Sequence, residues 1–234
     1  MSTTTSIQPV AQPSSAKMLQ AMVGIGLLCA LLIVLTFEGT LPRIERNKAE
    51  ALEKAIFKVV PGITSKQTFA FDSENQLSLI ADDTEADQLV YAGYDENNQL
   101  VGVAIEASGM GFADVIRILY GYDIQQEKII GFYVLESKET PGLGDKIEKD
   151  EAFLANFEAL DVSLTDNKER VKNKIVPVKQ GKKENPWEVD GITGATISSR
   201  AIGEILGGST GSWAPRLAKS LEVLTKKEDH NGSE

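Results

Sequence analysis

The chain has 234 residues, enough for one medium-sized domain with additional segments or for two small domains. A hydrophobic fraction of 42% allows a buried core, and a net charge of −10 argues against a nucleic-acid-binding protein that relies on phosphate contacts. One cysteine (Cys29) and one histidine (His230) exclude Cys/His metal centres, iron–sulfur clusters, intrachain disulfides and Ser–His–Asp triads. We therefore predict no metal site, and we expect any redox group to be organic.

The N-terminus combines a polar tail with one apolar segment. Residues 1–16 are rich in Ser, Thr, Gln and Pro and are predicted to be disordered. Residues 17–37 are predicted to be a transmembrane helix, because the 20 residues of Met18–Phe37 carry no charge. A helix of that length rises about 30 Å, the thickness of one bilayer core. The segment is long for the apolar core of a signal peptide and has no A-x-A cleavage site, so we expect a retained anchor.

The charges that flank the anchor leave its orientation open. Lys17 precedes the span, whereas Arg43, Arg46 and Lys48 follow it. The positive-inside rule, taken literally, places the following domain in the cytoplasm. However, long domains translocate largely regardless of charge, and these three cations are interleaved with glutamates.

Residues 38–62 are predicted to be an amphipathic stalk helix. Within Leu41–Val59, apolar residues recur at helical spacing between Glu and Lys, and Pro61-Gly62 is expected to end the helix. The stalk would lift the main domain, residues 63–225, away from the lipid. Residues 226–234 are predicted to be a polar tail.

The main domain is predicted to be α+β, with an antiparallel sheet and flanking helices, because strand patterns come first and helical patterns are grouped after them. The strands end at turn-rich sequences such as Asp95–Asn98 and Gln125–Glu127. The predicted strands are Leu89–Tyr94, Leu100–Ala107, Val115–Tyr122 and Ile129–Leu135, and the predicted helices are Asp150–Leu160, Ser198–Leu206 and Arg216–Leu224.

The segment Gly109–Asp114 begins like the dinucleotide-binding fingerprint G-x-G-x-x-G. Asp114 stands where the third glycine belongs, and a strand pattern follows instead of a helix. We therefore predict a glycine turn between two strands, which leaves open whether the turn lies near a ligand.

The segment Asp190–Arg200 leads into a helix and has the local features of an anion-binding site. Gly191 and Gly194 permit tight turns, and Thr196, Ser198 and Ser199 are N-cap-forming residues, so free backbone N–H groups converge at the helix start, where Arg200 would add charge. A phosphate fits such a position. The alternative is a well-capped helix without a ligand.

The segment Glu136–Ile147 contains a predicted tight turn at Pro141-Gly142. Leu143 lies between Gly142 and Gly144, so the backbone could approach a flat ligand while Leu143 packs on its face. A plain turn is the alternative.

These segments together resemble a known family. Thr193–Ser199, preceded by Asp190, resembles the flavinylation motif of periplasmic FMN-binding domains. With Glu139–Glu148 and the N-terminal anchor, the chain is similar to the G subunits of the Rnf ion-translocating electron-transport complex over residues 17–210. The C subunit of the sodium-pumping NADH:quinone reductase is a related but less close match.

The resemblance implies a covalent FMN, with its phosphate esterified to the hydroxyl of Thr196. It also implies flavin neighbours in both motifs, namely Thr193, Gly194, Ala195, Ser198, Ser199, Glu139, Thr140, Leu143 and Gly144.

The resemblance further implies a place in the cell and a set of partners. The domain would lie on the periplasmic side of the bacterial inner membrane, where a flavin transferase attaches FMN from FAD. The partners would be the A, B, C, D and E subunits of a complex that couples electron transfer between ferredoxin and NAD to sodium or proton movement. The alternatives are a non-redox anchored assembly subunit and, more remotely, a hydrolase, for which no imidazole is available.

Overall fold

The computed structural model describes residues 15–81, 84, 86 and 88–225. Its first element, helix α1 (Ser15–Val59), contains Pro42 and continues across the boundary at residues 50 and 51 between two compact units. This one helix contains the predicted transmembrane segment 17–37 and most of the predicted stalk helix 38–62. It ends at Val59, as predicted from Pro61-Gly62. Ser15 and Ala16, predicted to be disordered, are helical, whereas residues 1–14 and 226–234 lie outside the described residues.

The first part of α1 is the one helix in the described chain that is long and apolar enough to cross a membrane. None of its apolar window is buried by the rest of the protein. Side chains such as Met22, Leu27 and Ile33 are more than half exposed, so lipid is the solvent that suits them.

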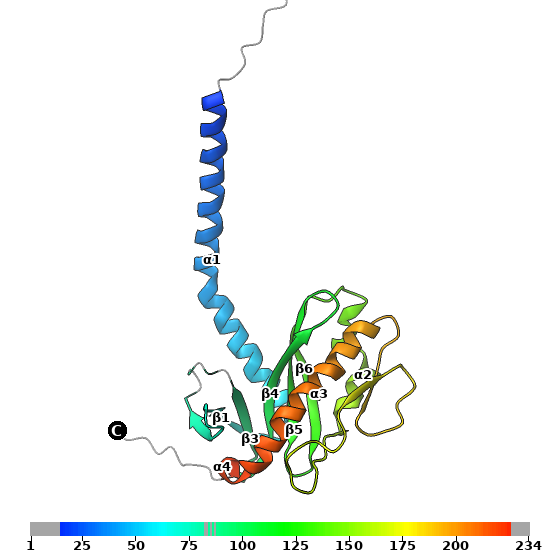
Figure 1. Cartoon of the computed structure of the whole chain (residues 1–234). Coiled ribbons are helices and arrows are strands. Elements are labelled where there is room, and N and C mark those ends of the chain that lie inside the picture. Colours follow the sequence, from blue (N-terminus) through cyan, green and yellow to red (C-terminus); the bar gives the residue numbers. More distant parts are fainter. Residues whose placement is uncertain (1–14, 82–83, 85, 87, 226–234) are drawn as a thin grey trace, which may run out of the picture. The chain divides into compact units, whose positions relative to one another are not determined.

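The main domain is built on a seven-stranded sheet in which all neighbouring strands are antiparallel (Figure 1). Its order is β2-β1-β3-β4-β5-β6-β7. The four predicted strands are confirmed within three residues at each end, and the α+β class with an antiparallel sheet is confirmed. The strands are β1 (Ser65–Phe71), β2 (Leu77–Ile80), β3 (Leu89–Tyr94), β4 (Leu100–Met110), β5 (Val115–Asp123), β6 (Lys128–Glu136) and β7 (Leu160–Asp161).

The two faces of the sheet are covered by different parts of the chain, because successive side chains of a strand point to opposite faces. Val103 and Ile105 belong to the large core that includes α3 (Thr196–Lys219). Ala104 belongs to a smaller core with the last turns of α1, where Ile56 and Val59 are buried. The end of the predicted stalk is therefore part of the folded domain.

The end of α1 lies close to the sheet at two glycines. Gly121 in β5 and Gly131 in β6 are register partners. A Cβ atom at Gly121 would lie 1.9 Å from the carbonyl oxygen of Val59, and one at Gly131 would lie 2.2 Å from it. Neither position has room for a side chain.

The bounds of the three predicted helices in the main domain need correction. The predicted helix Asp150–Leu160 is a short helix α2 (Glu151–Leu154), capped by the Asp150 carboxylate, then a 3₁₀ turn η2 (Ala155–Phe157), and Leu160 lies in β7. Residues 198–206 are helical as predicted, but α3 continues through Lys219, so the predicted helix 216–224 is the end of α3 followed, after Ser220, by α4 (Leu221–Thr225).

Tertiary packing explains two of the glycines inside α3. The helix lies against β8 (Val176–Val178), which pairs in parallel with β9 (Glu188–Asp190). A Cβ at Gly203 would lie 2.9 Å from the Pro177 side chain, and one at Gly207 would lie 2.8 Å from the Ile175 carbonyl oxygen. Small residues are needed at this contact, although they weaken the helical pattern.

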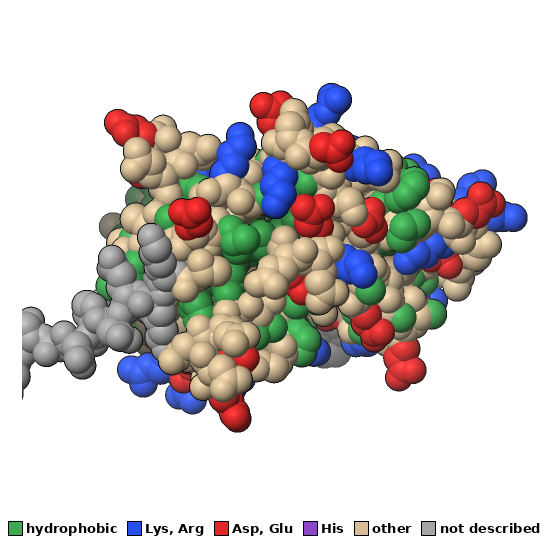
Figure 2. All heavy atoms as spheres, turned by 90° about the horizontal axis from the view of Figure 1, so that it is seen from below, with side chains coloured by type: hydrophobic (Ala, Val, Ile, Leu, Met, Phe, Trp, Pro, Cys, Tyr) green, Lys and Arg blue, Asp and Glu red, His purple; other side chains and the backbone are tan. Residues whose placement is uncertain are grey.

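The net negative charge is not gathered into one patch on the face of the molecule seen in Figure 2. Basic and acidic side chains are interspersed there, with hydrophobic side chains exposed between them. This mixture fits a general role of the charge in solubility.

Candidate functional site

The site is built around the start of α3. Gly194 has φ +86°, and the Ala195 N–H donates to the Ile192 carbonyl oxygen at 3.1 Å, which closes a turn after β9. The N-cap residue is Ala195, and no side chain caps the helix, so the expectation that Thr196, Ser198 or Ser199 caps it is wrong. Because the first N–H groups of a helix have no intrahelical partner, this end remains suited to an anion.

Ser198 and Ser199 are buried, and their hydroxyls form hydrogen bonds to neighbouring segments. The Ser198 Oγ donates to Glu139 Oε2 at 2.5 Å, and the Ser199 Oγ accepts from the Ile192 N–H at 3.1 Å. Their hydroxyls thus join the helix start to the 139–144 loop and to the 191–195 turn.

An apolar cavity of about 310 Å³ opens between the helix start, the tip of the β4–β5 hairpin and the 139–144 loop. Phe112, Leu143 and Ile197 line it and are each more than half exposed, at 64%, 54% and 56%. Exposed apolar side chains around a small cavity suit a flat, largely apolar ring system.

The 139–144 loop forms the predicted turn. Gly142 has φ +78°, and the Leu143 N–H donates to the Thr140 carbonyl oxygen at 3.1 Å, as in a turn with glycine at its third position. The 3₁₀ helix η1 (Gly144–Glu148) follows. The turn directs the exposed Leu143 to the cavity.

A second cavity, of about 380 Å³, lies on the other side of the helix start. Lys179, Lys182 and Arg200 line it, so it is basic. The Asp190 carboxylate holds its wall by accepting from the Gly181 N–H at 2.9 Å. This basic wall was missed in the sequence, where the run 179–183 has the composition of a solvated loop.

Thr196 lines both cavities and is the one described residue that they share. Thr196 is an exposed residue. The other residues implied by the family resemblance divide between the cavities: Thr193 and Ser199 line the basic one, whereas Gly194, Ala195, Ser198, Glu139, Thr140, Leu143 and Gly144 line the apolar one.

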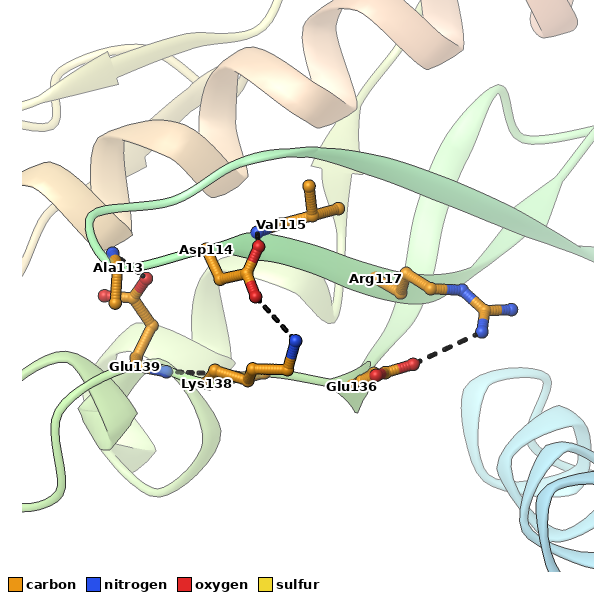
Figure 3. A network of polar contacts seen from close by, with 8 residues as sticks. Ala113, Asp114, Val115, Arg117, Glu136, Lys138 and Glu139 are labelled. Carbon is orange, nitrogen blue, oxygen red and sulfur yellow. Dashed lines mark hydrogen bonds and ion pairs between the residues drawn. The ribbon is translucent and has the colours of Figure 1, made fainter. Parts of the chain in front are cut away.

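Glu139 connects the elements around the apolar cavity. Its Oε1 accepts from the backbone N–H groups of Phe112 at 2.8 Å and Ala113 at 3.0 Å, and its Oε2 accepts from Ser198. Figure 3 shows Glu139 beside Ala113 of the hairpin tip. The glycine turn at 109–114 is a hairpin tip, as predicted, and this carboxylate brings it to the helix that carries Thr196.

The neighbouring ion pair gives the hairpin tip a pH-dependent contact. Lys138 Nζ lies 2.6 Å from Asp114 Oδ2 (Figure 3), and this hydrogen bond lowers the pKa of Asp114 below its ordinary value of 3.8. A lowered folded-state pKa contributes stability above the unfolded-state value, and this contribution is lost as the pH falls through the folded-state value.

We expect Lys138→Met to lower the melting temperature slightly at neutral pH, because the pair is exposed. The difference from the wild type should disappear at a pH below the folded-state pKa of Asp114. Melting curves of both proteins across this range test the prediction, and a difference that persists unchanged in acid would contradict it.

Comparisons with known proteins show which family the chain resembles. A family model described as FMN-binding domain matches residues 111–207. The G subunit of the ion-translocating oxidoreductase complex of Methanosarcina acetivorans is 31% identical over 193 residues, which cover 81% of this chain and 89% of the relative. The corresponding G subunit of Cereibacter sphaeroides (strain ATCC 17029) is 30% identical over 185 residues, which cover 75% of this chain and 74% of the relative.

Two solved structures share the fold. The crystal structure of Shewanella oneidensis NqrC has a TM-score of 0.58 and 16% identity, covering 76% of this chain and 98% of that one. The C subunit of the Na⁺-translocating NADH-quinone reductase of Parabacteroides distasonis has a TM-score of 0.54 and 21% identity, covering 80% and 98%. At these identities the similarity concerns the fold alone.

Proposed function

Because the chain belongs to the family of G subunits of ion-translocating oxidoreductase complexes, we propose that it carries FMN on Thr196 through a phosphoester bond. The family is that of a redox-driven complex, and the FMN-binding domain supports a role as its flavin electron carrier. When bound, FMN supplies one- and two-electron transfer, while the protein supplies its position and electrostatics.

The observation that carries the proposal is the place of Thr196 between the two cavities. A phosphate on its hydroxyl would meet Lys179, Lys182 and Arg200 together with the positive end of α3. The isoalloxazine would take the apolar cavity, against Phe112, Leu143 and Ile197. The residues present therefore fit both the anionic and the aromatic part of FMN.

Attachment from FAD balances without any further reactant. The Thr196 oxygen forms a bond to the phosphorus of the FMN part, the pyrophosphate bond breaks, AMP leaves, and the hydroxyl proton is released. A flavin transferase would supply this step, as the family resemblance implies. The phosphoester leaves the isoalloxazine unaltered and keeps the cofactor from being lost by dissociation.

The proposal includes a location and a wider reaction. The anchor at the start of α1 would hold the domain on the periplasmic side of the inner membrane. The other partners would be the A, B, C, D and E subunits of a complex that couples electron transfer between ferredoxin and NAD to ion translocation. Membership of the family supports a multi-subunit partner set.

The direct test is the intact mass of the full chain, purified from a host that carries the flavin transferase. We expect a gain equal to one FMN less one water, together with flavin fluorescence that remains with the chain after denaturation. A chain of bare polypeptide mass from such a host would overturn the proposed function.

A further inference from the structure

The carboxylate of Glu139 is buried, with only 6% of the residue exposed, and lies at the wall of the apolar cavity. It accepts three hydrogen bonds, two from backbone N–H groups and one from Ser198. It forms no ion pair with any residue that the structure describes. Among the described residues, Glu139 is therefore an acidic group with hydrogen-bond donors around it but no cation within ion-pair distance.

The backbone packs tightly on both oxygens of this carboxylate. A Cβ at Gly111 would lie 2.4 Å from Oε1, and one at Gly144 would lie 2.5 Å from Oε2. Such packing keeps water away, so a charge at this position is only weakly screened.

The fold alone does not require a charge here. The carbonyl oxygen of a glutamine could accept from Phe112 and Ala113, and its NH₂ group could donate to the Ser198 Oγ. An amide would also avoid the cost of burying a charge. The presence of an acid instead of an amide at this position therefore points to an electrostatic effect on the ligand of the cavity.

We propose that Glu139 is a positioning residue that fixes the flavin site and, through its negative charge, lowers the reduction potential of the bound FMN. Its hydrogen bonds join the hairpin tip that carries Phe112 to the helix start that carries Thr196. This inference rests on the proposed function, since it requires that the apolar cavity receives the isoalloxazine.

The direction of the effect follows from electrostatics. Reduction adds electrons to the ring, and a fixed negative charge in a poorly screened wall opposes the added charge. The Ser198 hydroxyl, which donates to the carboxylate, partly offsets this field. Removing the charge and removing the hydroxyl should therefore move the potential in opposite directions.

The first variant is Glu139→Gln in the full flavinylated chain, with Glu148→Gln as the matched control. Glu148 is an exposed acid in η1, so water screens its charge. We expect Glu139→Gln to shift the midpoint potential to more positive values, with the ratio of reduced to oxidised flavin at a fixed ambient potential rising about tenfold. Glu148→Gln should leave the potential unchanged. A flavinylated Glu139→Gln protein with the wild-type potential would overturn the proposal.

The second variant, Ser198→Ala, keeps the charge and removes the hydroxyl. We expect a shift to more negative potentials, opposite to that of Glu139→Gln. A role limited to packing would loosen the site in both variants and move both potentials in the same direction, which would overturn the proposal. If Glu139→Gln does not fold or take up FMN, the test rests on Ser198→Ala. An unchanged or more positive potential of the Ser198→Ala protein then overturns the proposal.

Intact mass separates this inference from the proposed function. A wild-type chain without FMN overturns both. A wild-type chain that carries FMN, with variants that lack the expected shifts, overturns only the role of Glu139.

Discussion

Thr196→Val is expected to remove FMN from the protein completely. Valine keeps the β-branched shape of threonine at the first residue of α3 but has no hydroxyl to esterify. The helix start and both cavities should persist, while the phosphoester cannot form. The intact mass should equal that of the polypeptide, and the denatured chain should show no flavin fluorescence.

Thr193→Val is the matched control for this change. Thr193 is a second exposed threonine of the same motif and lines the basic cavity but not the apolar one. We expect this variant to retain the full mass gain of one FMN less one water. If flavin instead persists on the Thr196→Val chain and disappears from the Thr193→Val chain, the attachment lies at Thr193.

Gly121→Ala is expected to destabilise the main domain by about 3 kcal/mol, at the upper end of the usual cost of overpacking. The added Cβ would lie 1.9 Å from the Val59 carbonyl oxygen, and a backbone atom cannot rotate away as a side chain would. The end of α1 would have to move off the sheet and expose Ile56 and its neighbours in the smaller core. Urea unfolding of the full chain in detergent, followed by tryptophan fluorescence, measures the loss.

Gly208→Ala provides the control for that substitution. Gly208 lies inside α3, and a Cβ there would meet nothing within 4 Å. Alanine should stabilise the helix by about 1 kcal/mol or less, because glycine is the poorer helix former. Equal stabilities of the two variants would contradict the close approach of α1 to Gly121.

The sheet was largely predictable from sequence because its signal is local. The four predicted strands alternate or run apolar between clear turns, and Asp95 and Asp123 accept backbone N–H groups in those turns. The short strands β2 and β7 have only four and two residues, so their patterns are too brief to identify alone.

The helices were less predictable because packing between distant segments decides them. Gly203 and Gly207 are unfavourable in an isolated helix, but the contact of α3 with β8 and the residues just before it needs small residues there. The packing of the last turns of α1 against the sheet was not predictable for the same reason.

The candidate site was partly predictable. The two glycine-containing motifs and the threonine that follows Gly194-Ala195 are each contiguous in the sequence, so they were identified without a structure. The bond between Ser198 and Glu139 joins residues 59 positions apart, and the basic wall at Lys179 and Lys182 comes from a further loop. Local patterns contain no information on such pairings.

Gly203 and Gly207 hold α3 tightly against β8 and the residues just before it, and this contact bears on how the protein would exchange electrons. This contact fixes α3 within the main domain, so the residue that would carry the proposed cofactor does not move relative to the sheet. The isoalloxazine could then move only as far as the ribityl chain of the cofactor allows. Within the main domain the proposed cofactor would therefore be held at one place, and an electron donor and an electron acceptor would both have to approach it there.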